Sequence, residues 1–243
     1  MKPFSGCAEK VEAMGEPLFE ELLEELASGD EESRRFAAED LGDHGDPAAV
    51  PALCEALRDP AVAVREAAAD ALMAIGGEAV CRHMVPLLDD EDCVVRNLAV
   101  EVFERLRQMA IPVCLELYRS PSPDLRKIAV DTLGHIEETR ESEGYALLHS
   151  ALDDEHVNVA AAAIEALGRL GGSGVEAEIG RRVGRHPWLD AVIFFSLARL
   201  GTPAARKLLA DVEPAGLEAQ AAYAWQAACE IAGVAEAENE PEV

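Results

Sequence analysis

The chain has 243 residues, 49% of them hydrophobic but only 5% aromatic, and it carries a formal net charge of −26. This composition is typical of a folded protein whose core is built from Ala, Leu and Val on helices rather than on strands. The negative charge argues against nucleic acid and membrane as partners, because both are bound mainly through Lys and Arg.

Residues 1–16 precede the first periodic segment and are predicted to form an N-terminal extension. They contain no apolar run of the kind that directs export, and the longest apolar stretches elsewhere are too short to span a bilayer. Residues Ser5 to Cys7 resemble the end of a lipoprotein cleavage site, but no apolar run precedes them. We therefore predict a cytoplasmic location.

Between residues 17 and 233 one pattern recurs, in which a charged residue is followed by alanines and then by leucine. Its first positions are 34, 65, 96, 126, 160, 190 and about 222, so successive copies lie 30 to 34 residues apart. That length accommodates two helices of about three turns each. We predict one all-α repeat domain, an α-solenoid (α-α superhelix) of about seven helical hairpins. Residues 234–243, which are acidic, are predicted to be a disordered tail.

The second helix of each predicted hairpin carries two apolar columns four residues apart, on one helical stripe. One column consists of Ala37, Ala68, Ala99, Ala129 and Ala163. The other consists of Leu41, Leu72, Phe103, Leu133, Leu167 and Leu197. These two columns are the predicted core of the second helices.

The segment from Asp59 to Leu72, in which Val64 and Arg65 are followed by alanines, resembles the HEAT-like repeats of the phycobilisome-lyase type, as does the segment from Asp90 to Arg96. The resemblance covers roughly residues 17 to 232. Such repeats occur in bilin lyases, iron hydroxylases, alkyl-base DNA glycosylases and many scaffolds, so the resemblance implies a fold rather than an activity.

The resemblance also implies a structural ladder. In the family, an Asp caps the second helix and an Arg reaches a carboxylate of a neighbouring repeat. Carried over to this chain, the ladder consists of Arg34, Arg65, Arg96, Arg126, Asp59 and Asp90. The Arg is replaced in later repeats by Ala160 and Asp190, so the ladder is expected to be irregular there.

No pattern in the chain indicates a catalytic residue, a metal or a cofactor. There is no Cys-x-x-Cys among the six cysteines, and Cys81, Cys93 and Cys114 align with apolar positions that we expect to be buried. The His-Glu dipeptides of the HEAT-like iron hydroxylases are absent. Asp131 and His135 lie one turn apart, which allows a weak cation site or acid/base pair, although we favour a solvated ion pair.

One column on the exposed face of the second helices is acidic in five repeats and aromatic in the sixth. Its members are Glu39, Asp70, Glu101, Asp131, Glu165 and Phe195. It is either a stripe that binds a basic protein surface or a solvated face that keeps the solenoid soluble. The basic group Arg181, Arg182, Arg185 and His186 is either a solvated helix end, which we favour, or a site for an acidic segment or for the protein's own tail.

These observations predict a non-enzymatic adaptor or scaffold that binds a protein with a basic surface or segment along the concave face. The alternative, implied by the resemblance, is a bilin lyase-like enzyme or enzyme subunit that holds a tetrapyrrole in the groove.

Overall fold

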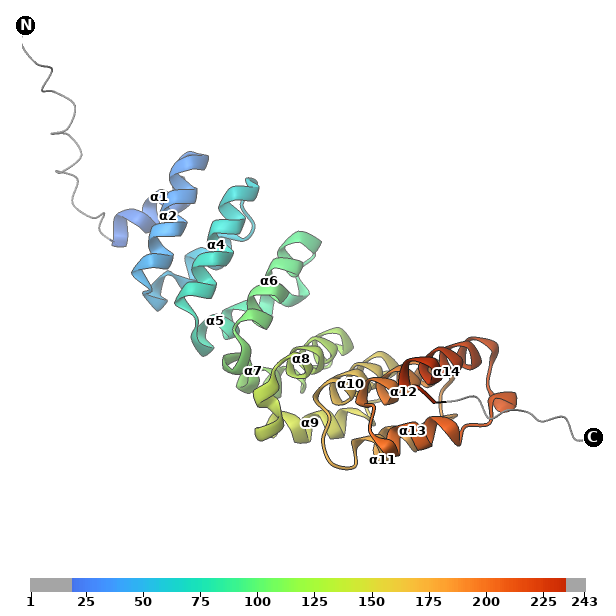
Figure 1. The fold of residues 1–243 in the computed structure, drawn as a ribbon. Helices are drawn as coiled ribbons and strands as arrows, with labels where there is room; N and C mark the ends of the chain where they lie inside the picture. The colour runs from blue at the N-terminus through green and yellow to red at the C-terminus, as the bar shows by residue number, and fades with distance from the viewer. Residues whose placement is uncertain (1–18, 235–243) are drawn as a thin grey trace, which may run out of the picture. The chain divides into compact units, whose positions relative to one another are not determined.

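The computed structural model describes residues 19–234, and within this range the chain is helical (Figure 1). The predicted N-terminal extension and nearly all of the predicted tail lie outside the described residues. Backbone packing groups the chain into two compact units, and the division falls between Leu106 and Arg107. We call residues 19–106 the N-terminal unit and residues 107–234 the C-terminal unit.

The N-terminal unit contains three helical hairpins, formed by α1 (Phe19–Ser28), α2 (Glu31–His44), α3 (Val50–Ala56), α4 (Val62–Ile75), α5 (Gly77–Met84) and α6 (Cys93–Arg105). The C-terminal unit contains four, formed by α7 (Ile111–Leu117), α8 (Pro123–His135), α9 (Glu143–Ala151), α10 (Val157–Leu170), α11 (Val175–Gly180), α12 (Pro187–Leu200), α13 (Pro203–Ala210) and α14 (Ala219–Ala232). Short 3-10 segments lie between several of these helices, among them η4 (Glu137–Glu141) and η5 (Pro214–Gly216). The predicted α-solenoid fold of about seven hairpins is confirmed.

The core follows the predicted columns. Every member of the alanine column is at most 1% exposed, and Leu41, Leu72, Phe103 and Leu133 are fully buried. The second helices pack side by side within each unit, α2 on α4 and α4 on α6, then α8, α10, α12 and α14 in succession (Figure 1). In α14 the buried residues are Ala221, Ala224, Ala228, Cys229 and Ala232. Ala224 and Ala228 take the places of the two apolar columns, so the seventh copy begins at Ala221, in keeping with the predicted start at about 222.

Small residues set how closely the second helices approach each other. A Cβ atom on Gly42 of α2 would lie 2.8 Å from the Cα of Ala71 in α4. At the corresponding glycines of the C-terminal unit, a Cβ on Gly134 would lie 2.9 Å from the Cα of Ala166, and a Cβ on Gly168 would lie 3.1 Å from the Cα of Ser196. In α4 the same column holds Met73, and α4 packs less extensively on α6 than α2 does on α4. A larger side chain in this column is expected to hold neighbouring helices further apart, in keeping with this difference.

Candidate partner-binding surfaces

The first rung of the predicted ladder joins α2 to the loop before α4. Nε and Nη2 of Arg34 donate to the two carboxylate oxygens of Asp59 at 2.7 and 2.9 Å. Asp59 also accepts the backbone N–H of Ala61 at 2.8 Å, which caps the turn before α4. The hydrogen bonds from Arg34 are the main reason why the pKa of the Asp59 carboxyl lies below its usual value.

The next two rungs differ from the family pattern. Arg65 donates to the backbone oxygens of Asp59 and Pro60 in the loop before its own helix, at 2.7 and 3.1 Å. Asp90 instead accepts from Arg58 at 2.5 Å. Arg96 donates to the backbone oxygen of Asp90 at 2.6 Å. Thus Arg65 and Arg96 each hold the loop before their own helix, and the alignment of the repeats alone does not reveal this role.

The most buried rung lies in the C-terminal unit. Nε and Nη2 of Arg126 donate to the carboxylate of Asp154 at 3.0 and 2.9 Å, and the two side chains are only 10% and 5% exposed. The hydroxyl of Tyr118 donates to the same carboxylate at 3.0 Å. Burial acts to raise the pKa of Asp154, but the hydrogen bonds from Arg126, the His156 backbone and Tyr118 outweigh it, so this pKa lies below its usual value. The prediction omitted Asp154, although it aligns with Asp59.

Of the two replaced positions in later repeats, Asp190 fastens a loop by another means. Asp190 is only 5% exposed and accepts the backbone N–H of Gly184 at 2.8 Å. Arg182, one of the predicted basic group, is buried and donates to Asp153 and to the backbone oxygen of Glu178. Arg181 and Arg185 remain exposed. Arg182 is therefore a structural residue, and the basic group at the surface is smaller than the sequence indicates.

The acidic column of the N-terminal unit borders a groove between α2 and α4. The groove has a volume of about 400 Å³, and its charged lining residues are Arg35, Glu39, Asp43, Glu66 and Asp70. Its floor is made by alanines and Gly42. Glu39 is paired with Arg35 on the same helix, whereas Asp43, Glu66 and Asp70 have no ion-pair partner among residues 19–234. Glu101 of α6 is exposed and pairs with Arg105 at 3.2 Å.

The column members of the C-terminal unit are less uniformly acidic. Asp131 of α8 is half-buried and pairs with Lys127. Glu165 of α10 is exposed, and Phe195 of α12 is 45% exposed. Phe194, its neighbour in sequence, is completely buried. The structure therefore presents Phe195 at the surface while Phe194 packs in the core.

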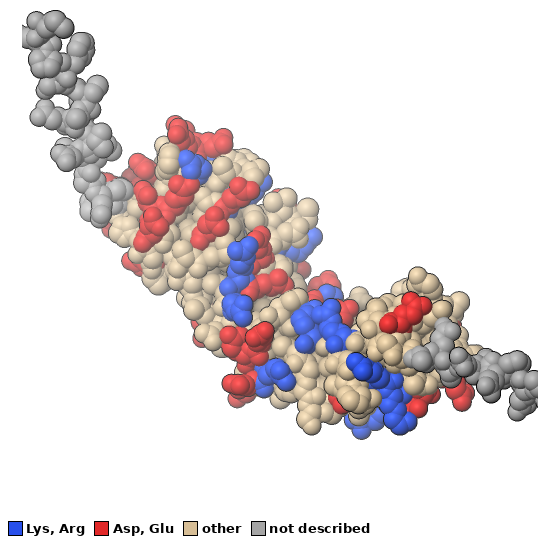
Figure 2. Space-filling model, in the orientation of Figure 1, with Lys and Arg blue, Asp and Glu red and all other residues tan. Residues whose placement is uncertain are grey.

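The two units also differ in overall charge. Residues 19–106 contain 22 Asp and Glu against seven Lys and Arg, whereas residues 107–234 contain 18 against 12. On the face drawn in Figure 2, acidic side chains form rows over α2 and α4, and basic side chains gather over parts of the C-terminal unit. The N-terminal unit is therefore the stronger attractor for a basic ligand.

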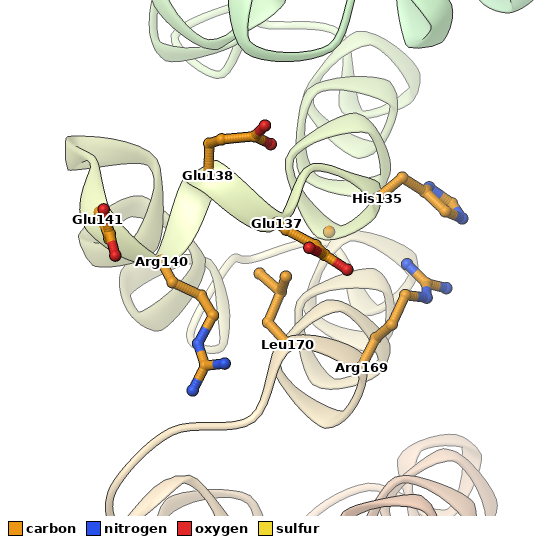
Figure 3. A pocket seen from close by; sticks show the side chains of 8 residues that line it. His135, Glu137, Glu138, Arg140, Glu141, Arg169 and Leu170 are labelled. Atoms are coloured by element: carbon orange, nitrogen blue, oxygen red, sulfur yellow. The ribbon is translucent and has the colours of Figure 1, made fainter.

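A second cavity, of about 820 Å³, opens in the C-terminal unit beside η4. Its lining is mixed in charge and consists of Gly134, His135, Glu137, Glu138, Arg140, Glu141, Arg169 and Leu170. In Figure 3 the side chains of His135 and Arg169 lie on the same side of the cavity, and Glu137 extends between the helices that carry them. Nδ1 of His135 lies 2.8 Å from the backbone oxygen of Asp131. Within residues 19–234 no three His, Cys, Asp or Glu residues are grouped as a metal ion would require.

The cysteines divide by burial. Cys81 and Cys114 are fully buried as expected, but the prediction for Cys93 is wrong, because it is exposed at the first position of α6. Val62, which holds the same first position in α4, is itself 56% exposed. The first position of a second helix therefore faces solvent, and an apolar residue there does not indicate core.

We expect a thiol-reactive maleimide at neutral pH to label Cys93 at least about tenfold faster than Cys54 or Cys81. Burial raises the pKa of Cys54 to about 12 and that of Cys81 to about 11, so neither holds appreciable thiolate. Timed labelling followed by peptide mass spectrometry measures each rate. Equal rates at the three sites in the native protein would contradict this packing.

Comparison with known proteins places the chain in a family. The sequence model of HEAT repeats matches residues 19–104 and 108–179. The chain belongs to the HEAT repeat family. The resemblance to HEAT-like repeats is thereby confirmed. No curated protein matches this HEAT repeat protein in sequence, and none of its described helices is long and apolar enough to cross a membrane.

Several solved structures are similar to this HEAT repeat protein. One is the CpcE–CpcF complex of phycocyanin lyase from Nostoc sp. PCC7120, with 22% identity, coverage of 92% of this chain and 91% of that chain, and a TM-score of 0.40. Another is human deoxyhypusine hydroxylase, with 17% identity, 88% and 84% coverage and a TM-score of 0.41. A third is a designed armadillo repeat protein in complex with the peptide (KR)4, with 18% identity, 88% and 99% coverage and a TM-score of 0.34. At these values the likeness concerns the helical-repeat fold alone.

Proposed function

We propose that this HEAT repeat protein is a non-enzymatic scaffold and that the groove between α2 and α4 binds a basic segment of a partner protein. The observation that carries the proposal is the charge of the groove, where three carboxylates without an ion-pair partner stand beside the single pair of Arg35 and Glu39. A Lys or Arg side chain that enters the groove is attracted by several carboxylates at once. Each attraction is stronger than in open water, because the nearby low-dielectric helix surface screens charges less than water does.

The alanine floor gives the groove a second property. Small side chains leave space along the surface that carries the carboxylates, and these are Ala63, Ala67, Ala71 and Ala74. The aliphatic stem of a Lys or Arg can lie on such a floor while its charged end reaches Glu66 or Asp70. The groove therefore suits long basic side chains better than a compact cation. Carboxylates distributed along it would chiefly raise the association rate and select the partner.

We expect the double substitution Glu66→Lys and Asp70→Lys to weaken binding of a labelled peptide of alternating Lys and Arg about tenfold or more at low salt. Two charge reversals beside the ligand remove attraction and add repulsion, each contributing on the order of 1 kcal/mol near a protein surface. Fluorescence anisotropy at low and at high salt measures the affinity. The difference between the two proteins should shrink at high salt, because exposed charges are then screened.

The control variant makes the same change in charge away from the groove, by Glu20→Lys and Glu24→Lys on the exposed face of α1. If both double variants lose affinity equally, the overall negative field binds the peptide and the groove is not a site. Wild-type affinity in the groove variant at low salt would also contradict the proposal. An unfolding curve for each protein excludes loss of fold as the cause.

The lyase-like alternative has no comparable support in the geometry. The cavity beside η4 is the larger of the two described above, but its lining mixes Glu137, Glu138 and Glu141 with Arg140 and Arg169, so it offers no uniformly basic site for the propionate groups of a tetrapyrrole. Incubation with a bilin distinguishes the two functions, because a bilin held by the protein changes its visible absorption spectrum.

A further inference from the structure

The two most exposed aromatic side chains of the described residues, Trp188 at 73% and Tyr223 at 76%, lie on α12 and α14 of the C-terminal unit. Phe195 of α12 is 45% exposed, as is Phe36 of α2 in the N-terminal unit. The whole chain contains only two Trp, three Tyr and six Phe. Aromatic residues are costly to leave in water and are enriched at binding hot spots. Their gathering on α12 and α14 therefore points to a surface that another molecule covers.

These side chains share one face of the helices. Trp188, Val192, Phe195 and Arg199 follow each other at steps of four, three and four residues, so they form one stripe along α12. Tyr223 of α14 occupies the column of Val192, because the seventh copy begins at Ala221 and the sixth at Asp190. We call Trp188, Val192, Phe195 and Tyr223 the aromatic face. Since each residue rises 1.5 Å along a helix, the stripe from Trp188 to Arg199 is about 16 Å long.

Basic groups stand at both ends of this stripe. Arg185 lies in the turn before α12, three residues from Trp188, and is exposed. Arg199 is exposed at the other end, and Arg169 of α10 is exposed in the same column. None of these three arginines has an ion-pair partner among the described residues. The only acidic residue of α12 itself, Asp190, is buried and accepts the backbone N–H of Gly184.

Close packing fixes the relation between the two arginine-bearing helices. A Cβ on Gly168 would lie 2.7 Å from the Cβ of Ser196, so the backbones of α10 and α12 touch at this point. The aromatic face therefore stands on closely packed helices rather than on loops. Arg169 belongs to the cavity beside η4 instead, since its Nη1 lies 3.1 Å from the position of a Cβ on Gly134 of α8.

We propose that this face binds a segment of a partner protein that carries apolar side chains flanked by carboxylates. The apolar side chains would cover Trp188, Phe195 and Tyr223, and the carboxylates would pair with Arg185 at one end and with Arg199 at the other. Burial of the aromatic face supplies affinity, and the arginines select against the basic segments that the acidic groove of the N-terminal unit attracts. The aromatic face is thus a second site, which prefers acidic segments where the proposed groove prefers basic ones, and it is independent of that groove.

The probe is a labelled synthetic peptide with the sequence Glu-Glu-Leu-Phe-Ser-Leu-Glu-Glu, compared with the same peptide in which Lys replaces every Glu. We expect saturable binding of the Glu peptide to the full chain and at least about tenfold weaker binding of the Lys peptide to the C-terminal face. Because the groove can also take the Lys peptide, both are measured on the Glu66→Lys, Asp70→Lys background. That background should leave the affinity of the Glu peptide unchanged or raise it slightly.

The decisive variant is Phe195→Glu, which places at this position the acidic residue found in the preceding five repeats and should leave the fold intact. We expect it to weaken the Glu peptide about tenfold or more. Ile231→Glu is the matched control, since Ile231 is 67% exposed on α14 but lies outside the aromatic face. Arg199→Glu should also weaken binding, and its effect should fall as salt is added.

The proposal is overturned if Phe195→Glu and Ile231→Glu behave alike, if the Glu and Lys peptides bind equally, or if no saturation occurs up to about 0.2 mM peptide. It is also overturned if sedimentation shows a dimer that Phe195→Glu dissociates, because a second copy would then cover the face. Higher affinity after removal of residues 235–243 would show that the chain's own acidic end competes for the face. In that case these residues, rather than a partner, are the occupant and the proposal again fails.

Discussion

Replacing Asp154 by Asn should lower the free energy of unfolding by about 3 kcal/mol, because the positive charge of Arg126 would remain in a site where both side chains are nearly buried. Asn retains the shape of Asp and can still accept the backbone N–H of His156, which Asp154 accepts at 2.9 Å. The loss therefore reports the charge together with the second acceptor oxygen, which Arg126 Nε and the Tyr118 hydroxyl share. Urea unfolding followed by circular dichroism measures it.

The pH dependence gives the same prediction a second readout. The folded-state pKa of Asp154 is depressed, whereas the unfolded value is about 3.9. The unfolded chain therefore binds more protons in acid, and the contribution of Asp154 is present above about pH 4 and lost as the pH falls through the folded value. The wild type should lose stability over this range more steeply than Asp154→Asn.

The control for Asp154→Asn is the variant Lys207→Ala. Lys207 and Asp211 form an exposed ion pair one turn apart on the surface of the same unit, at 2.7 Å. Exposed pairs of this kind contribute little, so the change should stay within about 0.5 kcal/mol. A similar loss in Lys207→Ala and Asp154→Asn would mean that the buried rung is no more important than a surface pair.

Gly134→Ala should destabilise the C-terminal unit by about 2 kcal/mol, although Ala is the better helix former. A Cβ at this position would lie 2.5 Å from the Cβ of Ala166 and 2.9 Å from its Cα, so α8 and α10 would have to separate. The second substitution Ala166→Gly removes the atom that clashes and should restore part of the loss. Thermal unfolding of the two single variants and the double variant gives the coupling between the sites.

Gly216→Ala is the matched control, because nothing lies within 4 Å of a Cβ there and the backbone is not in the left-handed region. It should change stability by no more than about 0.5 kcal/mol. The account is contradicted if Gly134→Ala is as harmless as Gly216→Ala, or if Ala166→Gly adds to the loss instead of offsetting it. Close contact between the helices would then not limit the size of the side chain in this column.

The repeat columns predicted the fold well because burial acts on each copy in the same way. Ala68 and Leu72 recur as Ala99 and Phe103, and all four are buried. A first-helix or second-helix position that is apolar in several copies therefore indicates core, except at the end of a helix. Val62 and Cys93, the first residues of α4 and α6, show that exception, since both are exposed although Val64 and Val95 in the same turns are buried.

The ladder and the site were less predictable from sequence, because they depend on which of several polar groups a long side chain reaches. The repeat spacing allows either Arg58 or Arg65 to reach the carboxylate of Asp90, and only the fold shows that Arg58 donates to it. The pairing of Glu39 with Arg35, and of Asp131 with Lys127, depends in the same way on side-chain conformation. The exposure of Phe195 beside the buried Phe194 follows from helical geometry and was predictable.

The central claim is that a basic segment occupies the groove between α2 and α4. The most direct test is an NMR titration of protein with labelled alanine methyl groups against the alternating Lys and Arg peptide. We predict saturable shifts for Ala63, Ala67, Ala71 and Ala74, and little change for the exposed Ala177 and Ala204 of the C-terminal unit. Shifts spread evenly over acidic surfaces, or absent from the groove at saturation, would contradict the claim.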